Sequence, residues 1–240
     1  MNRNKTLVAN LIWHKALQAG TALATFTDDA AMPDAALMDC LSPIEKEKAA
    51  GLHDRVEFRH FIARRCFQRL FICGVVAFNK APAQLSLIHR RDMPPQCLDA
   101  PGLSLSFSSS GPTAIACARQ DGVVGIDVER VRPIENAVAL AGRYFTPGEA
   151  DALAATPKAA QGLAFLHCWT AKEAGLKAVG KGIVDGLNTF TVKRKGGALD
   201  YRISGPALDG QRWCLEHLEI MPQHVIALVT VINVISGEKN

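Results

Sequence analysis

The sequence predicts an α+β protein built from two halves of one plan. Segments of alternating apolar and polar residues, typical of strands, occur in both halves. Each half also holds one long segment with the apolar spacing of a helix. A polar, glycine-containing stretch at 119–122 separates residues 1–120 from residues 121–240. We therefore expect two pseudo-symmetric halves, each a small antiparallel sheet packed on helices, with the active site at their interface.

In the N-terminal half, the pattern predicts a strand, two helices and two further strands. Their expected places are Thr6–Trp13, a charged helix that opens at Ser42-Pro43, Asp54–Phe78, Leu103–Phe107 and Thr113–Ala118. The longer helix has apolar residues at three- and four-residue steps on one side and arginines on its other faces. Small and turn-forming residues at 108–112 predict a tight connection whose loop exposes backbone amides and hydroxyls.

The C-terminal half is expected to begin with a strand and to end with a second sheet. The predicted segments are a strand Val123–Glu129, helices opening at Thr146-Pro147 and Thr156-Pro157, and a last apolar strand Val225–Val234. The second helix should run to about Val179, because Gly180 follows it. Short alternating segments after Asn188 predict the remaining strands.

The composition is that of a globular protein and excludes several classes. Of 240 residues, 48% are hydrophobic and 21% are charged, and the net charge of +4 favours an acidic small molecule or an acidic protein partner over nucleic acid. The seven cysteines form no Cys-x-x-Cys pair, so we interpret them as reduced core residues. The N-terminal segment lacks the apolar core of a secretory signal, and Val225–Ile235 is shorter than the roughly 18 to 20 residues of a membrane helix. We expect a cytoplasmic monomer with no membrane partner.

Two acidic residues share one face of a predicted strand. In the run Gly125-Ile126-Asp127-Val128-Glu129 the side chains alternate, so Asp127 and Glu129 point the same way, about 7 Å apart at Cα. Each carboxylate repels the other, and either a bound cation or bulk water relieves that repulsion. The pattern alone leaves two interpretations open, a cation site and an amphipathic strand with a solvated face.

A third acid lies in the predicted helix that ends near Val179. Glu173 and Lys177 are one turn apart on the same side, and Lys172 lies about 100° around the helix from Glu173. By itself this is the pattern of an ordinary surface ion pair. Beside the strand acids, however, Glu173 can complete a site for a hard, oxygen-seeking ion, with the lysines left for phosphate oxygens. The two motifs together predict a magnesium site formed by Asp127, Glu129 and Glu173.

These two motifs resemble the signature pair of the surfactin-type (Sfp-like) 4'-phosphopantetheinyl transferases. Gly125–Glu129 is followed some forty residues later by Trp169-Thr170-Ala171-Lys172-Glu173-Ala174, and the resemblance extends over about residues 102–183. It implies that residues 1–120 bind coenzyme A and that residues 121–240 carry the magnesium site and the catalytic helix. It also implies the reaction, transfer of 4'-phosphopantetheine from coenzyme A to a serine hydroxyl of an apo acyl or peptidyl carrier protein, an acidic helical domain, with release of 3',5'-ADP.

The resemblance also implies roles for single residues of the C-terminal half. The three acids correspond to the magnesium ligands, and Lys172 and Lys177 correspond to catalytic lysines that contact the phosphates of coenzyme A. Glu149 corresponds to the proposed general base. The run Thr146-Pro147-Gly148-Glu149 is equally typical of a capping box, in which the acid accepts a hydrogen bond from the Thr146 backbone, and both interpretations stay open.

In the N-terminal half the sequence departs from the family pattern. Ser108-Ser109-Ser110 stands where the family usually has Ser-His-Ser, so a neutral hydroxyl replaces a potential cation. Met93-Pro94-Pro95 is the nearest remnant of the family's Gly-x-Lys-Pro segment. We expect Ser108 and Ser109 to contact coenzyme A. Arg59 is a candidate ligand of its 3'-phosphate, with a solvated helix face as the alternative.

Two other functions remain open from the sequence. Clustered acids with a lysine also serve magnesium-dependent nucleases and phosphodiesterases, although the Glu-x-Lys spacing common in such sites is missing near Glu129. The replacement at Ser109 is compatible with a non-catalytic relative that binds a carrier protein or coenzyme A without transferring anything.

Overall fold

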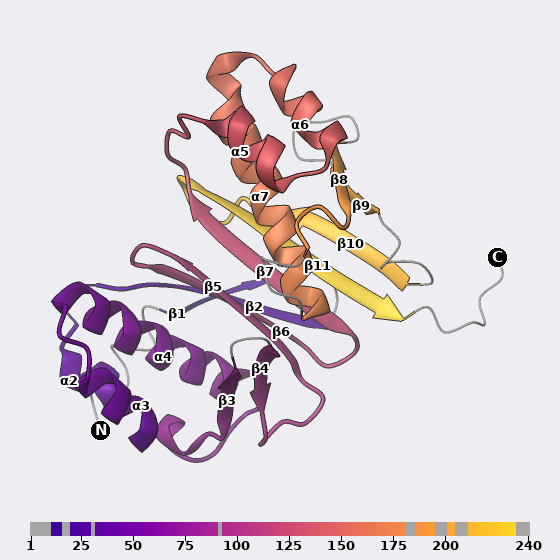
Figure 1. Ribbon diagram of the computed structural model, residues 1–240. Coiled ribbons are helices and arrows are strands. Elements are labelled where there is room, and N and C mark those ends of the chain that lie inside the picture. Colours follow the sequence, from indigo (N-terminus) through magenta and orange to yellow (C-terminus); the bar gives the residue numbers. More distant parts are fainter. Residues whose placement is uncertain are drawn as a thin grey trace. The chain divides into compact units, whose positions relative to one another are not determined.

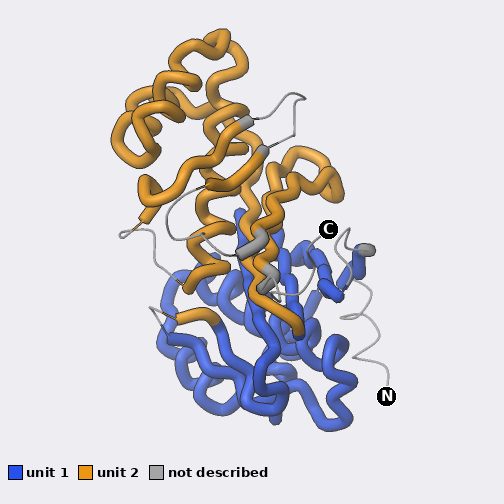
Figure 2. Tube along the Cα trace, turned by 90° about the vertical axis from the view of Figure 1, so that its right-hand side faces the viewer, with its two compact units in different colours: residues 1–90, 95–120 blue, residues 91–94, 121–240 orange. Residues whose placement is uncertain are grey.

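The computed structural model describes residues 11–15, 20–29, 32–90, 93–180, 186–194, 201–204 and 211–233. The chain divides into two compact units, one of residues 1–90 and 95–120 and one of residues 91–94 and 121–240 (Figure 2). Both contain helices and small antiparallel sheets (Figure 1), which confirms the α+β class. The pseudo-symmetry of the two halves stays a prediction.

The first unit is built on a four-stranded antiparallel sheet with the strand order β1-β2-β6-β5. Its strands are β1 (Leu11–Lys15), β2 (Thr21–Thr27), β5 (Ser104–Ser110) and β6 (Thr113–Arg119). Helix α4 (Arg55–Val75) packs on this sheet (Figure 1), and its Phe67 ring stacks on Phe26 of β2 at a centroid distance of 5.5 Å. Burial of these large apolar side chains against the strands holds the helix in place.

The two predicted helices of this unit begin where their capping residues lie. Ser42 forms a capping box with Glu45 at the start of α3 (Pro43–Ala50). The Asp54 side chain accepts a hydrogen bond from the Glu57 amide at the start of α4. Both starts are confirmed, because a side-chain oxygen there satisfies an amide that has no partner within the helix.

Several short elements were not predicted. They are β2, α2 (Asp34–Met38), the 3₁₀ turn η1 (Pro82–Gln84), β3 (Leu87–Arg90) and β4 (Met93–Cys97). Of the predicted first strand, residues 6–10 lie outside the described residues, and β1 covers the rest and two residues more.

The serines at 108–110 belong to a strand, so the expected loop is wrong. Ser108 pairs with Ile115 and Ser110 pairs with Thr113 across the β5–β6 hairpin. Pairing with β6 keeps these residues extended, and the connection shrinks to Gly111-Pro112, with Gly111 at a φ of +60°. The serines therefore lie in the edge strand of this sheet.

The second unit places a long helix on a three-stranded antiparallel sheet with the order β10-β11-β7. The elements are β7 (Val123–Arg130), α5 (Ala137–Tyr144), α6 (Pro147–Ala154), α7 (Lys158–Val179), β8 (Thr191–Arg194), β9 (Tyr201–Ser204), β10 (Gln211–His217) and β11 (His224–Asn233). Helix α7 lies along β7 and β11, and β8 and β9 form a separate hairpin (Figure 1). The predicted end of α7 is confirmed, since Gly180 caps it at a φ of +70°. Helix α5 was not predicted.

Helix α7 approaches β7 closely because Gly125 has no side chain. A Cβ atom at Gly125 would lie 1.9 Å from the Ala174 carbonyl oxygen and 2.6 Å from the Ala178 amide nitrogen. The atoms that approach Gly125 belong to the backbone of Ala174 and Ala178, one turn apart on α7. Asp127 shares the face of Gly125, since strand side chains alternate. The close approach of the helix to the strand therefore brings one side of α7 next to Asp127.

Two features, the cysteines and the length of the helices, were both expected from the composition. All seven cysteines are free thiols, four of them buried and three partly buried, as expected. Within the described ranges, no helix combines the length and the apolar character needed to cross a membrane.

Candidate active site

The contact between β7 and α7 contains an ion pair. The Lys177 Nζ atom lies 2.7 Å from Asp127 Oδ1 and also donates to the Ile126 carbonyl oxygen at 3.2 Å. The Asp127 side chain is only 7% exposed, whereas that of Lys177 is 30% exposed. A buried carboxylate thus holds a cation that still reaches solvent, an arrangement that can present positive charge to an anionic ligand.

Glu173 lies buried beside this pair. Burial is the largest influence on its carboxyl group and raises its pKa to about 7, while Lys177 lowers it and the charges of Asp127 and Glu129 raise it further. The three predicted acids are therefore close enough for their charges to interact. A carboxyl group with a strongly raised pKa next to other acids is typical of a functional site.

Glu129 forms an ion pair with Arg132, a residue that the sequence pattern did not indicate. The Arg132 Nη1 atom donates to Glu129 Oε2 at 2.9 Å, and half of the Arg132 side chain is exposed. An exposed pair of this kind contributes about 0 to 1 kcal/mol, because solvent screens it. A divalent ion could therefore displace Arg132 at low cost.

The three acids are of the ligand type that a hard divalent ion prefers, and they lie near one another. They do not form a complete coordination site. In the described part of the chain, no three His, Cys, Asp or Glu side chains lie close enough together to hold a metal. Lys177 and Arg132 occupy oxygens of Asp127 and Glu129 instead. Carboxylate oxygens are the ligands that Mg²⁺ prefers, and a cation relieves the repulsion that Glu173 feels. The donor set fits such an ion once it replaces the two basic side chains.

Glu149 is a buried acceptor with several donors. Its Oε2 atom accepts from the Thr146 amide at 2.8 Å and lies 2.9 Å from the Lys172 ammonium, and its Oε1 atom accepts from the Val192 amide at 2.6 Å. The capping-box interpretation is confirmed. The role of Glu149 as general base stays a prediction, and this geometry gives it no support, because its acceptor positions are already used.

Lys172 is fully buried on another side of α7. Its ammonium donates to the carbonyl oxygens of Leu187 at 2.5 Å and Phe190 at 2.8 Å, besides the pair with Glu149. The rings of Phe145 and Phe190 lie 5.6 and 4.9 Å from the ammonium. All three hydrogens of an ammonium have acceptors here. The structure therefore does not bring Lys172 to the β7 acids, and its predicted phosphate contact is not supported by this arrangement.

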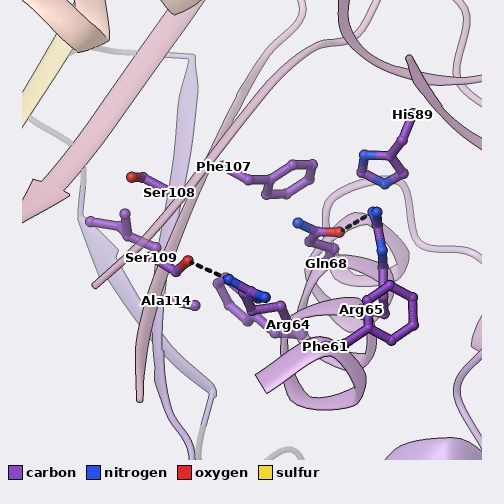
Figure 3. A pocket seen from close by; sticks show the side chains of 11 residues that line it. Phe61, Arg64, Arg65, Gln68, His89, Phe107, Ser108, Ser109 and Ala114 are labelled. Atoms are coloured by element: carbon purple, nitrogen blue, oxygen red, sulfur yellow. Dashed lines mark hydrogen bonds between the residues drawn. The ribbon is translucent and has the colours of Figure 1, made fainter. Parts of the chain in front are cut away.

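The predicted coenzyme A ligands of the first unit have different surroundings. Arg59 donates to both oxygens of Asp28, to Asp34 and to the carbonyl oxygens of Met32 and Asp29, which uses every N–H of its guanidinium. Its contact with a 3'-phosphate stays a prediction that would require breaking these bonds. Ser108 and Ser109 line a cavity instead (Figure 3).

Sequence reasoning missed Gly125 and Arg132. A signal for Gly125 existed, since an isolated glycine within a strand indicates close approach of another backbone, and Ala174 and Ala178 offer the matching small residues at helical spacing. Arg132 follows the strand in an irregular segment, where periodicity says nothing about side-chain partners.

The second unit is similar to a known protein family. Residues 123–229 match the model of the 4'-phosphopantetheinyl transferase superfamily. This range contains both β7 and α7, and with them every candidate residue of the second unit.

Individual relatives agree with the family match. The chain is 39% identical to the 4'-phosphopantetheinyl transferase psf-1 of Bacillus pumilus over 93 residues, which is 39% of each chain. It is 28% identical to Sfp of Bacillus subtilis (strain 168) over 157 residues, 65% of this chain and 67% of the relative. It is 30% identical to HetI of Nostoc sp. over 158 residues, 63% of this chain and 65% of the relative. The matched region thus spans about two fifths of the first relative and about two thirds of the others. Over residues 123–229 the chain is similar to the 4'-phosphopantetheinyl transferase superfamily.

Proposed function

We propose that this chain transfers 4'-phosphopantetheine from coenzyme A to a serine hydroxyl of an apo acyl or peptidyl carrier protein and releases 3',5'-ADP. The similarity to 4'-phosphopantetheinyl transferases supports the class of reaction. The observation that carries the proposal is the meeting of acids from β7 and α7 around Lys177, whose ammonium lies 2.7 Å from Asp127. Transfer from a pyrophosphate requires positive charge near its oxygens, and this is where the described residues can gather it.

Asp127, Glu129 and Glu173 would hold one Mg²⁺ ion. When bound, such an ion neutralises charge on the pyrophosphate and on the leaving 3',5'-ADP. The Glu173 carboxyl group supports this assignment, because burial and then the charges of the neighbouring acids raise its pKa, and a cation would relieve the repulsion among the three acids.

Lys177 contributes a mobile positive charge. If Asp127 held an ion, the Lys177 ammonium would lose this partner at the open side of the β7–α7 contact, where 30% of its side chain is exposed. From there it can donate to a phosphate oxygen of the substrate as negative charge accumulates on it.

Glu149 and Lys172 act as positioning residues. Their ion pair joins α6 to α7, while hydrogen bonds from Lys172 to Leu187 and to Phe190 join α7 to the segment that precedes β8. Glu173 follows Lys172 directly in the helix, so fixing the rotation of α7 about its axis also fixes the direction of Glu173.

The proposal is tested by incubating the purified chain with coenzyme A, Mg²⁺ and several apo carrier proteins and measuring the intact mass of each carrier. A gain of one phosphopantetheine group on at least one carrier is expected, with no gain for the Asp127→Asn variant. Coenzyme A binding without any mass gain on a broad carrier panel would instead favour a non-catalytic relative. The family match does not favour the phosphodiesterase alternative, and nicking of plasmid DNA by the wild type would revive it.

A further inference from the structure

The second unit contains a cavity of about 460 Å³ between the N-terminal half of α7 and one end of the β10–β11 hairpin. Helix α7 contributes Leu163 and His167, β10 contributes His217, and β11 contributes His224 and Val225. Its volume lies in the range of small-molecule pockets, roughly 300 to 1,000 Å³. None of the residues predicted to bind magnesium or coenzyme A, or to act in catalysis, lines this cavity. It is therefore a second candidate site of this unit.

The cavity lies beside the strand that carries two of the acids. Val131 lines it and follows Glu129 by two residues, and Val225 lines it and pairs with Glu129 across β7 and β11. Opposite residues of an antiparallel pair point to the same face of the sheet. The carbonyl oxygen of Gln223, another lining residue, accepts from the Val131 amide at 2.8 Å, and Gln223 has a φ of +59°. Residues other than glycine rarely adopt this conformation, which is more frequent at ligand sites.

The walls of the cavity disfavour a ligand of either charge. Among the described residues that line it there is no Lys or Arg, and the acid Glu219 lies at its surface, so an anion finds no cationic partner. Burial is the main cause that lowers the pKa of His217 to about 4, and His167 lowers it further. Surroundings that keep an imidazole uncharged also disfavour a bound cation. The cavity therefore suits an uncharged ligand.

The lining combines apolar surface with a hydrogen-bond acceptor. Leu163 and Val131 keep 46% and 42% of their surface exposed, so an apolar ligand would cover them. The His224 Nδ1 atom lies 2.8 Å from the Pro222 carbonyl oxygen. Because a carbonyl oxygen only accepts, Nδ1 carries the proton, and Nε2 of the neutral ring is an acceptor. A hydroxyl or amide group, which can donate, matches this acceptor.

We propose that this cavity binds an uncharged amphipathic small molecule, whose apolar body covers Leu163 and Val131 and whose hydroxyl or amide group donates to His224. Burial of apolar surface supplies most of the affinity, and the hydrogen bond fixes the orientation of the ligand. Neither the three acids nor the two lysines take part in this binding. The inference therefore does not depend on the transfer reaction.

The test uses three probes of nearly equal size and different charge: benzyl alcohol, protonated benzylamine and benzoate. Each is titrated into the full chain at neutral pH while the amide signals are followed by nuclear magnetic resonance. Benzyl alcohol should shift the signals of residues that line the cavity, with a dissociation constant on the order of 1 mM. The two charged probes should bind about tenfold or more weakly, because the cavity offers their charges no partner.

Three variants at the cavity test the location. Ala160→Trp places a large ring at an exposed position of the wall, and Leu163→Gln removes apolar surface from another exposed position. Both should weaken benzyl alcohol binding about fivefold or more. His224→Phe should weaken it about two- to tenfold, since the acceptor is lost. The matched control is Ala159→Trp, because Ala159 is an exposed neighbour on α7 that does not line the cavity. This control should bind like the wild type.

Several results would overturn the proposal. They are equal affinities of the three probes, shifts confined to amides away from the cavity, and wild-type affinity for benzyl alcohol in all three cavity variants. Thermal unfolding of each variant shows that it is folded, and two variants at exposed positions keep the test valid if one of them does not fold. A chain that binds benzyl alcohol as described but transfers nothing contradicts the proposed function and supports this inference.

Discussion

The two lysines of helix α7 differ in what surrounds them. Lys177 is partly exposed and pairs with Asp127, whereas Lys172 has no exposed surface and pairs with Glu149. An exposed cation is free to move between partners, while a buried pair must stay intact, because an isolated buried charge is costly. Lys177 can therefore bind a ligand, whereas Lys172 holds neighbouring elements in place.

Loss of Lys172 should lower stability strongly. In Lys172→Met the Glu149 carboxylate stays buried without its cation, and we expect the free energy of unfolding to fall by about 3 kcal/mol. Urea denaturation measures this change. The matched variant Lys177→Gln keeps a donor beside the buried Asp127 carboxylate, so it should lose clearly less stability than Lys172→Met, about 1 kcal/mol, and should lose activity instead. A Lys172→Met protein as stable as the wild type but inactive would show that Lys172 acts in the chemistry.

Loss of one acid at the β7–α7 contact should spare the fold. Asp127→Ala and Glu173→Ala relieve repulsion among the carboxylates while they remove a ligand. We expect the free energy of unfolding without metal to stay within about 1 kcal/mol of the wild type and transferase activity to vanish. Paired unfolding curves and transfer assays check this. Full turnover by either variant with Mg²⁺ present would contradict the assignment.

His217 should make stability depend on pH. Burial lowers its pKa from 6.5 to about 4, and its ring packs against His167 at a centroid distance of 4.7 Å. Since the folded state disfavours the protonated ring, the free energy of unfolding should fall as pH drops from 6.5 towards 4, by up to about 3 kcal/mol. Unfolding of the wild type and His217→Gln at several pH values measures the difference. The same pH slope in both proteins would show that His217 is not responsible.

At the scale of secondary-structure elements, the helix ends were predicted correctly where a single residue determines the local backbone conformation. Ser42, Asp54 and Gly180 mark helix ends through side-chain oxygens or a positive φ, so local chemistry suffices. Short elements such as α5 escaped because eight residues give little periodicity. The serine run at 108–110 was misassigned because its partner strand, and not its own sequence, keeps it extended.

The close contact between α7 and β7 makes Gly125 the most sensitive position of this pair of elements. A methyl group there would lie 1.9 Å from the Ala174 carbonyl oxygen, so Gly125→Ala must push the helix off the strand. We expect a loss of about 3 kcal/mol or more and a separation of Asp127 from Lys177. Gly142→Ala, in helix α5 with open space around it, should stabilise by about 0.5 to 1 kcal/mol. Equal thermal midpoints for the two variants would contradict this account.

The sequence also predicted which acids meet, but not how α7 distributes its other side chains. Strand alternation and the family resemblance predicted that Asp127, Glu129 and Glu173 share a site. The charges of the two strand acids do act on Glu173, and the shared ion stays a prediction. Helix α7, however, buries residues on several sides, because β7, β11 and the hairpin β8–β9 all pack against it. Helical spacing alone therefore could not show that Lys172 faces away from the acids that Lys177 reaches.

At the scale of the whole molecule, the two units contain different candidate sites. The second unit contains the acids, both lysines and the whole family match of residues 123–229. The first unit contains the cavity with Arg64 and the serine strand. The predicted roles of residues 1–120 and 121–240 stay a prediction. That the guanidinium of Arg59 is fully engaged could not be predicted from the sequence, because it depends on acceptors such as Asp28, more than thirty residues away in the chain.

We propose that three carboxylates from β7 and α7 share one divalent ion. Electron paramagnetic resonance of Mn²⁺, titrated into the chain in the presence of coenzyme A, measures this directly because bound Mn²⁺ loses the signal of the free ion. We predict one bound ion per chain for the wild type, competition by Mg²⁺, and loss of the bound ion in both Asp127→Asn and Glu173→Gln. Undiminished Mn²⁺ binding by both variants would contradict the account.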